Sequence, residues 1–295
     1  MHESRKTRKV EVELSYVVPG SFVNRRFVSP GQEVNTGRYE SHRVEIGDAR
    51  DIAGEFTFDT NGFVLAPHRS AVRDYFDVDE VDAVYPDEVV ETVKTLTGAD
   101  RVASRGWMVR TSGEIASRER KVVGYTHRGG VQPPAAEAHV DFMPERAESM
   151  AAQIYADDFP GSPPYTRFIA SSLWRAFSAP PQDCPLALCD GRTVRPDEGI
   201  PNTLYIVDEI PDRETMLGEM PGEDSAITAA IFHYNPEHRW WYFSNMHRDE
   251  VLLLKFHDSD PSKACRVPHT AFRDPSFPDA HPRASIEFRT FAYFI

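Results

Sequence analysis

Residues 269–285 read HTAFRDPSFPDAHPRAS: a histidine, a proline-rich connection, and an Arg-x-Ser that begins a run of alternating residues. Alternation with a period of two is typical of a β-strand, whose successive side chains point to opposite faces. One face of this predicted strand carries Arg283 and Ser285 and continues through Glu287 and Arg289. This polar face either lies in water or lines the interior of a barrel, where it could hold an anion.

The rest of the chain predicts a mainly β fold with helices in its N-terminal half. Short apolar runs follow one another closely after residue 184, separated by Pro, Gly, Asp and Asn. This spacing is typical of a β-sandwich or β-barrel. Helices are expected mainly in 67–97 and 144–172, and no linker divides residues 1–295, which predicts a single domain. The predicted strands are 10–18, 41–48, 55–65, 100–110, 185–189, 203–207, 226–232, 240–243, 251–256 and 284–294.

Proline and glycine positions predict where several of these elements begin and end. Residues 59–62, Asp-Thr-Asn-Gly, are expected to form a hairpin-type turn between apolar flanks. Pro86 is expected to start a helical segment that Gly98 ends, and Pro144 is expected to open another helix. A further short helix is expected just before Trp174.

Bulk composition narrows the class of protein. The chain has 295 residues with 46 acidic and 33 basic side chains, a formal net charge of −13. Phosphate binding needs a basic surface, so a nucleic-acid partner is not expected. There is no apolar run long enough to span a membrane, and the charged N-terminus carries no secretory signal, so we expect a cytoplasmic protein. The three cysteines show no disulfide or zinc-ligand pattern. Nothing indicates the oligomeric state.

His139-Val-Asp141 is a candidate metal-binding pair. On a strand, residues two apart face the same way, so one segment presents an imidazole beside a carboxylate. With one distant histidine, the pair makes the 2-His-1-carboxylate triad of non-haem iron oxygenases. An isolated H-x-D can also be a surface histidine and a solvated aspartate. A second one, His247-Arg-Asp249, directly precedes the apolar run 251–256 and is not followed by a suitable histidine and Arg-x-Ser.

His269 is the preferred third ligand because of its distance from the Arg-x-Ser. Arg283 lies 14 positions on, with Ser285 on the same strand face. If 2-oxoglutarate chelates iron through its keto acid end, its far carboxylate needs a buried cation. The arginine fork matches a carboxylate, and the serine hydroxyl can donate to it. The rival histidines are His233, His238, His257 and His281.

Together these motifs give the chain a family resemblance. It resembles the fungal and bacterial hydroxylase/desaturase family that includes the fungal gibberellin desaturase and the cephamycin methoxylation protein. The resemblance covers most of the chain. It departs from the family at Phe142, where tyrosine is expected, and at Ala176, where proline is expected. The stretches that carry it are 48–50, 56–63, 97–99, 139–141, 174–175, 185–190, 249–255, 258–259, 268–272 and 283–289.

The resemblance implies a double-stranded β-helix (a jelly-roll, cupin-like core) with flanking helices. It implies an Fe(II)/2-oxoglutarate-dependent oxygenase that uses O₂ and oxidises an unactivated C–H of a small molecule in specialised metabolism. The outcome would be hydroxylation, desaturation or ring formation. The iron ligands would be His139, Asp141 and His269, and Arg283 with Ser285 would hold the co-substrate.

Four residues are weaker candidates for contact with the substrate: Arg110, Phe142, Arg175 and Arg289. Arg175 could instead stack on Trp174 at the surface. Arg289 could instead pair with Glu287 or another acid, which is the favoured interpretation. Two other classes of protein remain open. One is a zinc-dependent hydrolase with the same three ligands, which would not need Arg283 and Ser285. The other is a non-catalytic jelly-roll binding protein.

Overall fold

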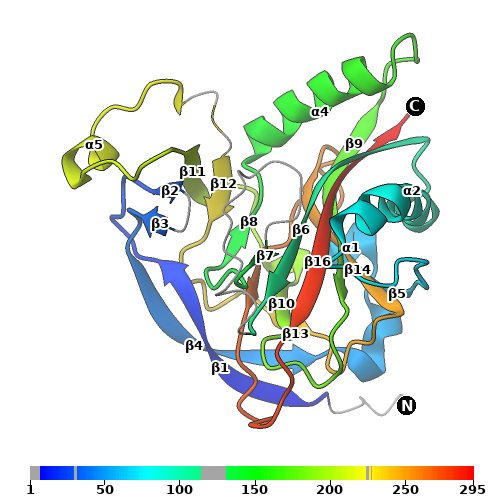
Figure 1. Ribbon diagram of the computed structural model, residues 1–295, viewed down its shortest axis with the longest axis horizontal. Coiled ribbons are helices and arrows are strands. Elements are labelled where there is room, and N and C mark those ends of the chain that lie inside the picture. The colour runs from blue at the N-terminus through cyan, green and yellow to red at the C-terminus, as the bar shows by residue number, and fades with distance from the viewer. Residues whose placement is uncertain (1–6, 30–31, 114–130, 224–225, 227) are drawn as a thin grey trace.

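The computed structural model describes residues 7–29, 32–113, 131–223, 226 and 228–295. Within these residues the chain forms two β-sheets, with the longer helices on the outside (Figure 1). The prediction of a mainly β fold with flanking helices is confirmed. No helix in the described part of the chain is both long and apolar enough to cross a membrane.

The larger sheet has ten strands and carries the two segments predicted to bind metal. Its short central strands β15 and β8 are neighbours, although well over a hundred residues separate them in the chain. The order across the sheet is β1 (Lys9–Val17), β4 (Tyr39–Asp48), β13 (Trp240–Tyr242), β10 (Leu186–Cys189), β15 (His269–Ala271), β8 (His139–Val140), β12 (Thr228–Ile231), β11 (Ile200–Ile206), β2 (Arg25–Ser29) and β3 (Gln32–Asn35).

The smaller sheet has six strands, and its centre is the C-terminal strand. β16 pairs antiparallel with both β9 and β6 along most of its length. The order is β5 (Phe63–Pro67), β14 (Glu250–Asp258), β9 (Arg167–Ala176), β16 (Ala284–Phe294), β6 (Arg101–Thr111) and β7 (Val131–Gln132).

The longest helix covers the outer face of the smaller sheet. Helix α2 (Val78–Thr97) buries Val81, Tyr85, Val89 and Val93, a stripe at four-residue spacing. The Tyr85 ring packs edge-on against Phe288 of β16 at 5.9 Å between centroids. The other helices are α1 (Phe58–Asn61), α4 (Pro144–Asp158), α5 (Arg213–Leu217) and the 3₁₀ segments η1 (Arg50–Glu55) and η2 (Gly191–Thr193).

Two predicted helix boundaries are confirmed and one is wrong. Gly98 ends α2 in the left-handed conformation, with φ of 73°, and Pro144 is the first residue of α4. Pro86, however, lies inside α2, which begins after Asp77 because the Asp77 side chain accepts from the backbone N–H of Glu80. Proline removes one helical hydrogen bond. The buried stripe keeps the helix continuous through it.

The predicted hairpin turn at 59–62 is wrong. The segment is the short helix α1, whose first turn is capped by the Thr57 hydroxyl accepting from the N–H of Thr60. Gly62 closes it with φ of 83°, and the strand begins only at Phe63. The same residue types that favour a tight turn also cap a helix, so the local sequence did not separate the two.

The predicted helix before Trp174 is also wrong. Residues 167–176 form strand β9, which lies between β14 and β16. Both faces of a central strand are covered here, one by the other sheet and one by α2, so nearly every residue of β9 is buried. A strand buried on both faces shows no alternation, and periodicity alone cannot distinguish it from a buried helix.

Candidate metal centre

The three predicted ligands meet where β8 and β15 pair. His139 of β8 and His269 of β15 are register partners, with ring centroids 4.5 Å apart. Asp141 follows β8 immediately. The candidate ligand atoms of the three residues all lie within 4.8 Å of one another. The sheet therefore brings a sequentially distant histidine to the H-x-D, as the sequence predicted.

Backbone carbonyls orient both imidazoles. His139 Nδ1 lies 2.9 Å from the carbonyl oxygen of Glu137, and His269 Nδ1 lies 3.0 Å from that of Val267. A carbonyl can only accept, so in each case Nδ1–H donates and Nε2 keeps its lone pair. Both Nε2 atoms face Asp141 Oδ1, at 3.6 and 3.8 Å. A hydrogen bond from the other ring nitrogen to a backbone carbonyl, as Nδ1 makes in both residues, is characteristic of metal-binding histidines.

The electrostatics keep the ligands in the forms that bind metal. Burial lowers the pKa of His269 to about 4, aided by the neighbouring His139. Burial would raise the pKa of Asp141, but the charge of Arg289, together with the two histidines, holds that pKa well below its usual range. A neutral imidazole and an ionised carboxylate are the species that coordinate a metal.

Arg283 and Ser285 lie buried with unused hydrogen-bonding capacity. Their exposed fractions are 2% and 1%. Arg283 Nη1 donates to the carbonyl of Cys184 at 2.8 Å, and its guanidinium lies over the Trp174 ring. Arg283 Nε and Ser285 Oγ have no hydrogen-bond partner among the described residues. Buried polar groups are normally satisfied, so this orphaned pair fits the carboxylate of a bound molecule. The polar face of β16 therefore faces the interior and not water.

Two cavities meet at the three-residue cluster. One is a pocket of about 20 Å³ that includes both histidines, Arg283 and Trp174 in its lining. The other has a volume of about 260 Å³ and includes His139 and Asp141. Its lining includes both apolar and charged side chains. The remaining lining residues of this larger cavity are Arg26, Arg105, Gly106, Trp107, Arg110, Glu137, Phe142, Met150, Asn202, Leu204, Ala229, Ile231 and Arg289.

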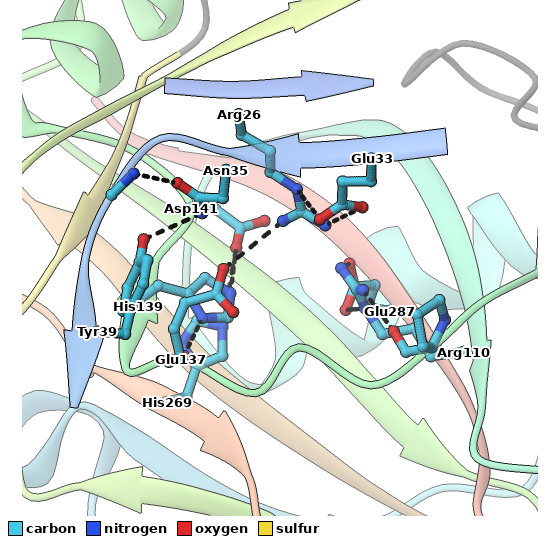
Figure 2. Close-up of polar contacts among 12 residues, drawn as sticks. Arg26, Glu33, Asn35, Tyr39, Arg110, Glu137, His139, Asp141, His269 and Glu287 are labelled. Atoms are coloured by element: carbon cyan, nitrogen blue, oxygen red, sulfur yellow. Dashed lines mark hydrogen bonds and ion pairs between the residues drawn. The ribbon is translucent and has the colours of Figure 1, made fainter. Parts of the chain in front are cut away.

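A chain of ion pairs joins the two cavities. Arg110 Nε lies 3.1 Å from Glu287 Oε2, and Arg289 Nη2 lies 3.4 Å from Glu287 Oε1. Arg289 Nε in turn donates to Asp141 Oδ2 at 2.6 Å. Figure 2 shows the Arg110–Glu287 pair beside the histidine cluster. Arg289 is thus paired with acids, the arrangement favoured from the sequence, and it also lines the larger cavity.

Arg175 lies on the opposite face of the smaller sheet and lines neither of the two cavities. Successive strand residues point to opposite faces, so Trp174 points inward and Arg175 points toward α2. Its guanidinium is fully buried between Tyr75 and Tyr85 and binds the carbonyls of His68 and Arg248. Both of its predicted roles, substrate contact and surface stacking on Trp174, are therefore wrong.

The rejected histidines lie elsewhere. His247 of the second H-x-D is exposed, and His238 pairs with Glu198 at 2.8 Å. His257 stacks on Phe168, and His233 contacts the carbonyl of Val17. His281 forms an isolated parallel β-bridge with Gln182 through the backbone.

Three charged residues of the larger cavity were not predicted from the sequence: Arg26, Arg105 and Glu137. The sequence could have identified Glu137, because this residue lies two positions before His139 and so shares its strand face. Arg105 is placed by a β-bulge: Phe288 pairs with Trp107 and Arg289 with Arg105, so Gly106, at φ of 62°, is skipped. An isolated glycine in a strand signals such a bulge. Arg26 reaches in from β2, with no local signal (Figure 2).

Comparison with known proteins identifies the family to which this chain belongs. The family described as "Oxidoreductase/YMDC permease-like domain" matches residues 14–293. The hydroxylase/desaturase efuI of Hormonema carpetanum is 32% identical over 265 residues, covering 87% of this chain and 85% of that protein. The Fe(II)/2-oxoglutarate-dependent dioxygenase nvfI of Aspergillus novofumigatus is 29% identical, covering 90% of this chain and 87% of that protein.

The chain belongs to the hydroxylase/desaturase family of Fe(II)/2-oxoglutarate-dependent oxygenases. The solved structure of the iron and alpha-ketoglutarate-dependent endoperoxidase NvfI superposes with a TM-score of 0.75 at 26% identity, covering 97% of this chain and 98% of that one. The predicted jelly-roll core is thereby confirmed. The oxygenase is an oxidoreductase of the 2-oxoglutarate-dependent dioxygenase class, whose members use Fe(II), 2-oxoglutarate and O₂.

Proposed function

We propose that His139, Asp141 and His269 hold Fe(II), and that Arg283 and Ser285 anchor the far carboxylate of 2-oxoglutarate. The observation that supports this proposal is that the three candidate ligands lie next to a buried arginine with unused hydrogen-bonding capacity. A cluster of two imidazoles and one carboxylate lies beside a cavity lined by a buried arginine, one nitrogen of which has no partner among the described residues. Iron, 2-oxoglutarate and O₂, once bound, would supply the oxidising power for reaction at an unactivated C–H.

The chain's own residues position and shield this chemistry. The carbonyls of Glu137 and Val267 fix the two imidazoles, and Arg289 holds Asp141. The buried Arg283 places a cation in the lining of the smaller cavity, where the carboxylate of 2-oxoglutarate could pair with it. In the present conformation the smaller cavity has room for about one water. Binding of 2-oxoglutarate therefore requires lining side chains to move.

The substrate, we propose, is a small, largely apolar molecule that binds in the 260 Å³ cavity. Phe142, Trp107 and Ile231 offer apolar contacts, and Arg110 and Arg289 are candidates for a polar group of the substrate. Phe142 packs against Phe256 and Phe291, so its ring forms part of a rigid wall. Names of relatives include hydroxylase, desaturase and endoperoxidase, so hydroxylation, desaturation or ring formation is the proposed outcome.

Residues 1–295 are proposed to act as one oxygenase domain. The support is a continuous core between the two sheets, to which residues from β1 through β16 contribute. A cytoplasmic location stays a prediction from the sequence.

The test is succinate formation from 2-oxoglutarate with Fe(II) supplied. His139→Ala and Asp141→Ala each should reduce it at least about 100-fold, because each removes a metal ligand. The matched control is His247→Ala in the second H-x-D, whose side chain is exposed and should leave succinate formation unchanged. Undiminished turnover in the first two variants would overturn the assignment.

A further variant, Arg283→Met, separates the alternatives. A zinc-dependent hydrolase would use the three ligands without 2-oxoglutarate, so Arg283→Met would leave it active. A non-catalytic jelly-roll protein would form no succinate at all. Arg283 Nε and Ser285 Oγ, which lack partners among the described residues, support the oxygenase, because a hydrolase would not require them.

A further inference from the structure

The two carboxylate oxygens of Asp141 face different partners. Oδ1 is the atom nearest the imidazoles, 3.6 Å from His139 Nε2 and 3.8 Å from His269 Nε2. Oδ2 accepts the Nε–H of Arg289 at 2.6 Å. The Arg289 and Asp141 side chains are 12% and 11% exposed, so water competes little for this contact. One oxygen is therefore available to a metal and the other is occupied.

This division matters because a carboxylate can bind a metal through one oxygen or both. If Asp141 used both, it would occupy a position that the co-substrate and O₂ need. A charge-assisted hydrogen bond of this length is among the stronger polar contacts in proteins. It disfavours the rotation that would bring Oδ2 to the metal.

Arg289 is itself held by Glu287 of the same strand, which in turn accepts from Arg110 of the neighbouring strand β6. Its Nη2 lies 3.4 Å from Glu287 Oε1, and both Glu287 oxygens accept from Arg110, at 3.1 and 3.3 Å. Arg110 also donates to the carbonyl of Pro133 at 3.0 Å. The register partner of Arg289, Arg105, pairs instead with Asp158 at 2.6 Å. Arg105 therefore lines the same cavity but has an acidic partner of its own.

We propose that Arg289 is a positioning residue that keeps Asp141 a one-oxygen metal ligand, and that the Arg110–Glu287 pair fixes Arg289 for this task. The proposal rests on the proposed function, since it takes the three-residue cluster as the metal site. This role of Arg289 is separate from substrate contact. The number of coordination positions left open on the metal depends on the hydrogen bond from Arg289 to Asp141.

The test counts the waters bound to Mn(II) in the protein, using water-proton relaxation and deuterium pulsed EPR, without substrate or turnover. In Arg289→Met the freed Asp141 should bind through both oxygens, with loss of about one bound water per Mn(II) relative to wild type. Arg289→Lys should restore part of the wild-type value, because an ammonium can still donate to Oδ2. Glu287→Gln, which loosens Arg289 without removing it, should lie between wild type and Arg289→Met.

Arg105→Met is the matched control. It removes an arginine that lines the same cavity, is the register partner of Arg289 and contacts Asp158, so its water count should equal that of wild type. An equal water count in folded Arg289→Met and wild type would overturn the proposal. If Arg289→Met does not fold, unchanged counts in both Arg289→Lys and Glu287→Gln would overturn it.

One further variant separates failure of this inference from failure of the proposed function. If His139→Ala binds Mn(II) as tightly as wild type, the metal site itself is misassigned. If His139→Ala loses Mn(II) and Arg289→Met keeps the wild-type water count, only the role of Arg289 is wrong.

Discussion

Two buried arginines on the two faces of the smaller sheet have opposite surroundings. Arg175 is on the outer face, beneath α2, and Arg283 is on the inner face at the start of β16. Their exposed fractions are 0% and 2%, so both guanidinium groups are removed from water. They differ in the hydrogen-bond and aromatic partners that surround each guanidinium group.

Arg175 is surrounded by partners. It donates to Tyr85 Oη at 3.1 Å, to two backbone carbonyls and to the ring of His68, and it lies between two tyrosine rings. Arg283 has one carbonyl, one aromatic ring and an Nε without a partner among the described residues. A buried cation that the fold satisfies stabilises structure. A buried cation left short of partners is suited to bind a ligand, and the comparison predicts different losses when each is removed.

The largest effect is expected for Arg283→Met. Affinity for 2-oxoglutarate should fall about 100-fold, or about 3 kcal/mol, because charge-assisted hydrogen bonds to the carboxylate are lost. The thermal midpoint should change little, since replacing an under-satisfied buried charge by an apolar side chain is often nearly neutral. Anaerobic calorimetric titration with metal present measures the affinity. Unchanged affinity would remove Arg283 from the site.

Arg175→Met should show the reverse. The free energy of unfolding should fall by about 2 kcal/mol, because the carbonyls of His68 and Arg248 lose their donor in a buried place. The 2-oxoglutarate affinity of the folded variant should equal that of wild type. Denaturant unfolding gives the first quantity and the same titration gives the second. A large loss of affinity without loss of stability would show that the two faces are not distinct in role.

A smaller effect is expected for Ser285→Ala. Its Oγ has no partner among the described residues, so stability should not change. Affinity for 2-oxoglutarate should fall about 5-fold, or about 1 kcal/mol, the contribution of one ordinary hydrogen bond. Equal affinity in the variant and in wild type would leave Arg283 as the anchor without help from the hydroxyl.

The smallest effect is a pH dependence on the outer face. Burial, followed by the charge of Arg175, lowers the pKa of His68. The unfolded chain therefore takes up this proton at higher pH, so the stabilisation is complete above about pH 6.5 and is lost as pH falls through the lower folded pKa. Unfolding curves across this range should show the free energy of unfolding decreasing as the pH is lowered. His68→Asn, whose Oδ1 can still accept from Arg175, should flatten the slope; an unchanged slope would contradict this explanation.

The sequence could predict the inner face better than the outer one. The spacing from His269 to Ser285 and the alternation along β16 identified the residues that meet in the cavity, because a strand fixes which side chains share a face. It could not assign Arg175, since β9 is buried on both faces and shows no alternation. Arg26 and the contact between Arg289 and Asp141 depend on strand pairing across long stretches of chain, which local patterns do not encode.

The central claim is that His139, Asp141 and His269 bind iron in reach of 2-oxoglutarate. The most direct measurement is the visible absorption spectrum after anaerobic addition of Fe(II) and 2-oxoglutarate. We expect a weak charge-transfer band in wild type and in His247→Ala, and its loss in Asp141→Ala. Absence of the band from wild type, or a band of equal intensity in Asp141→Ala, would contradict the claim.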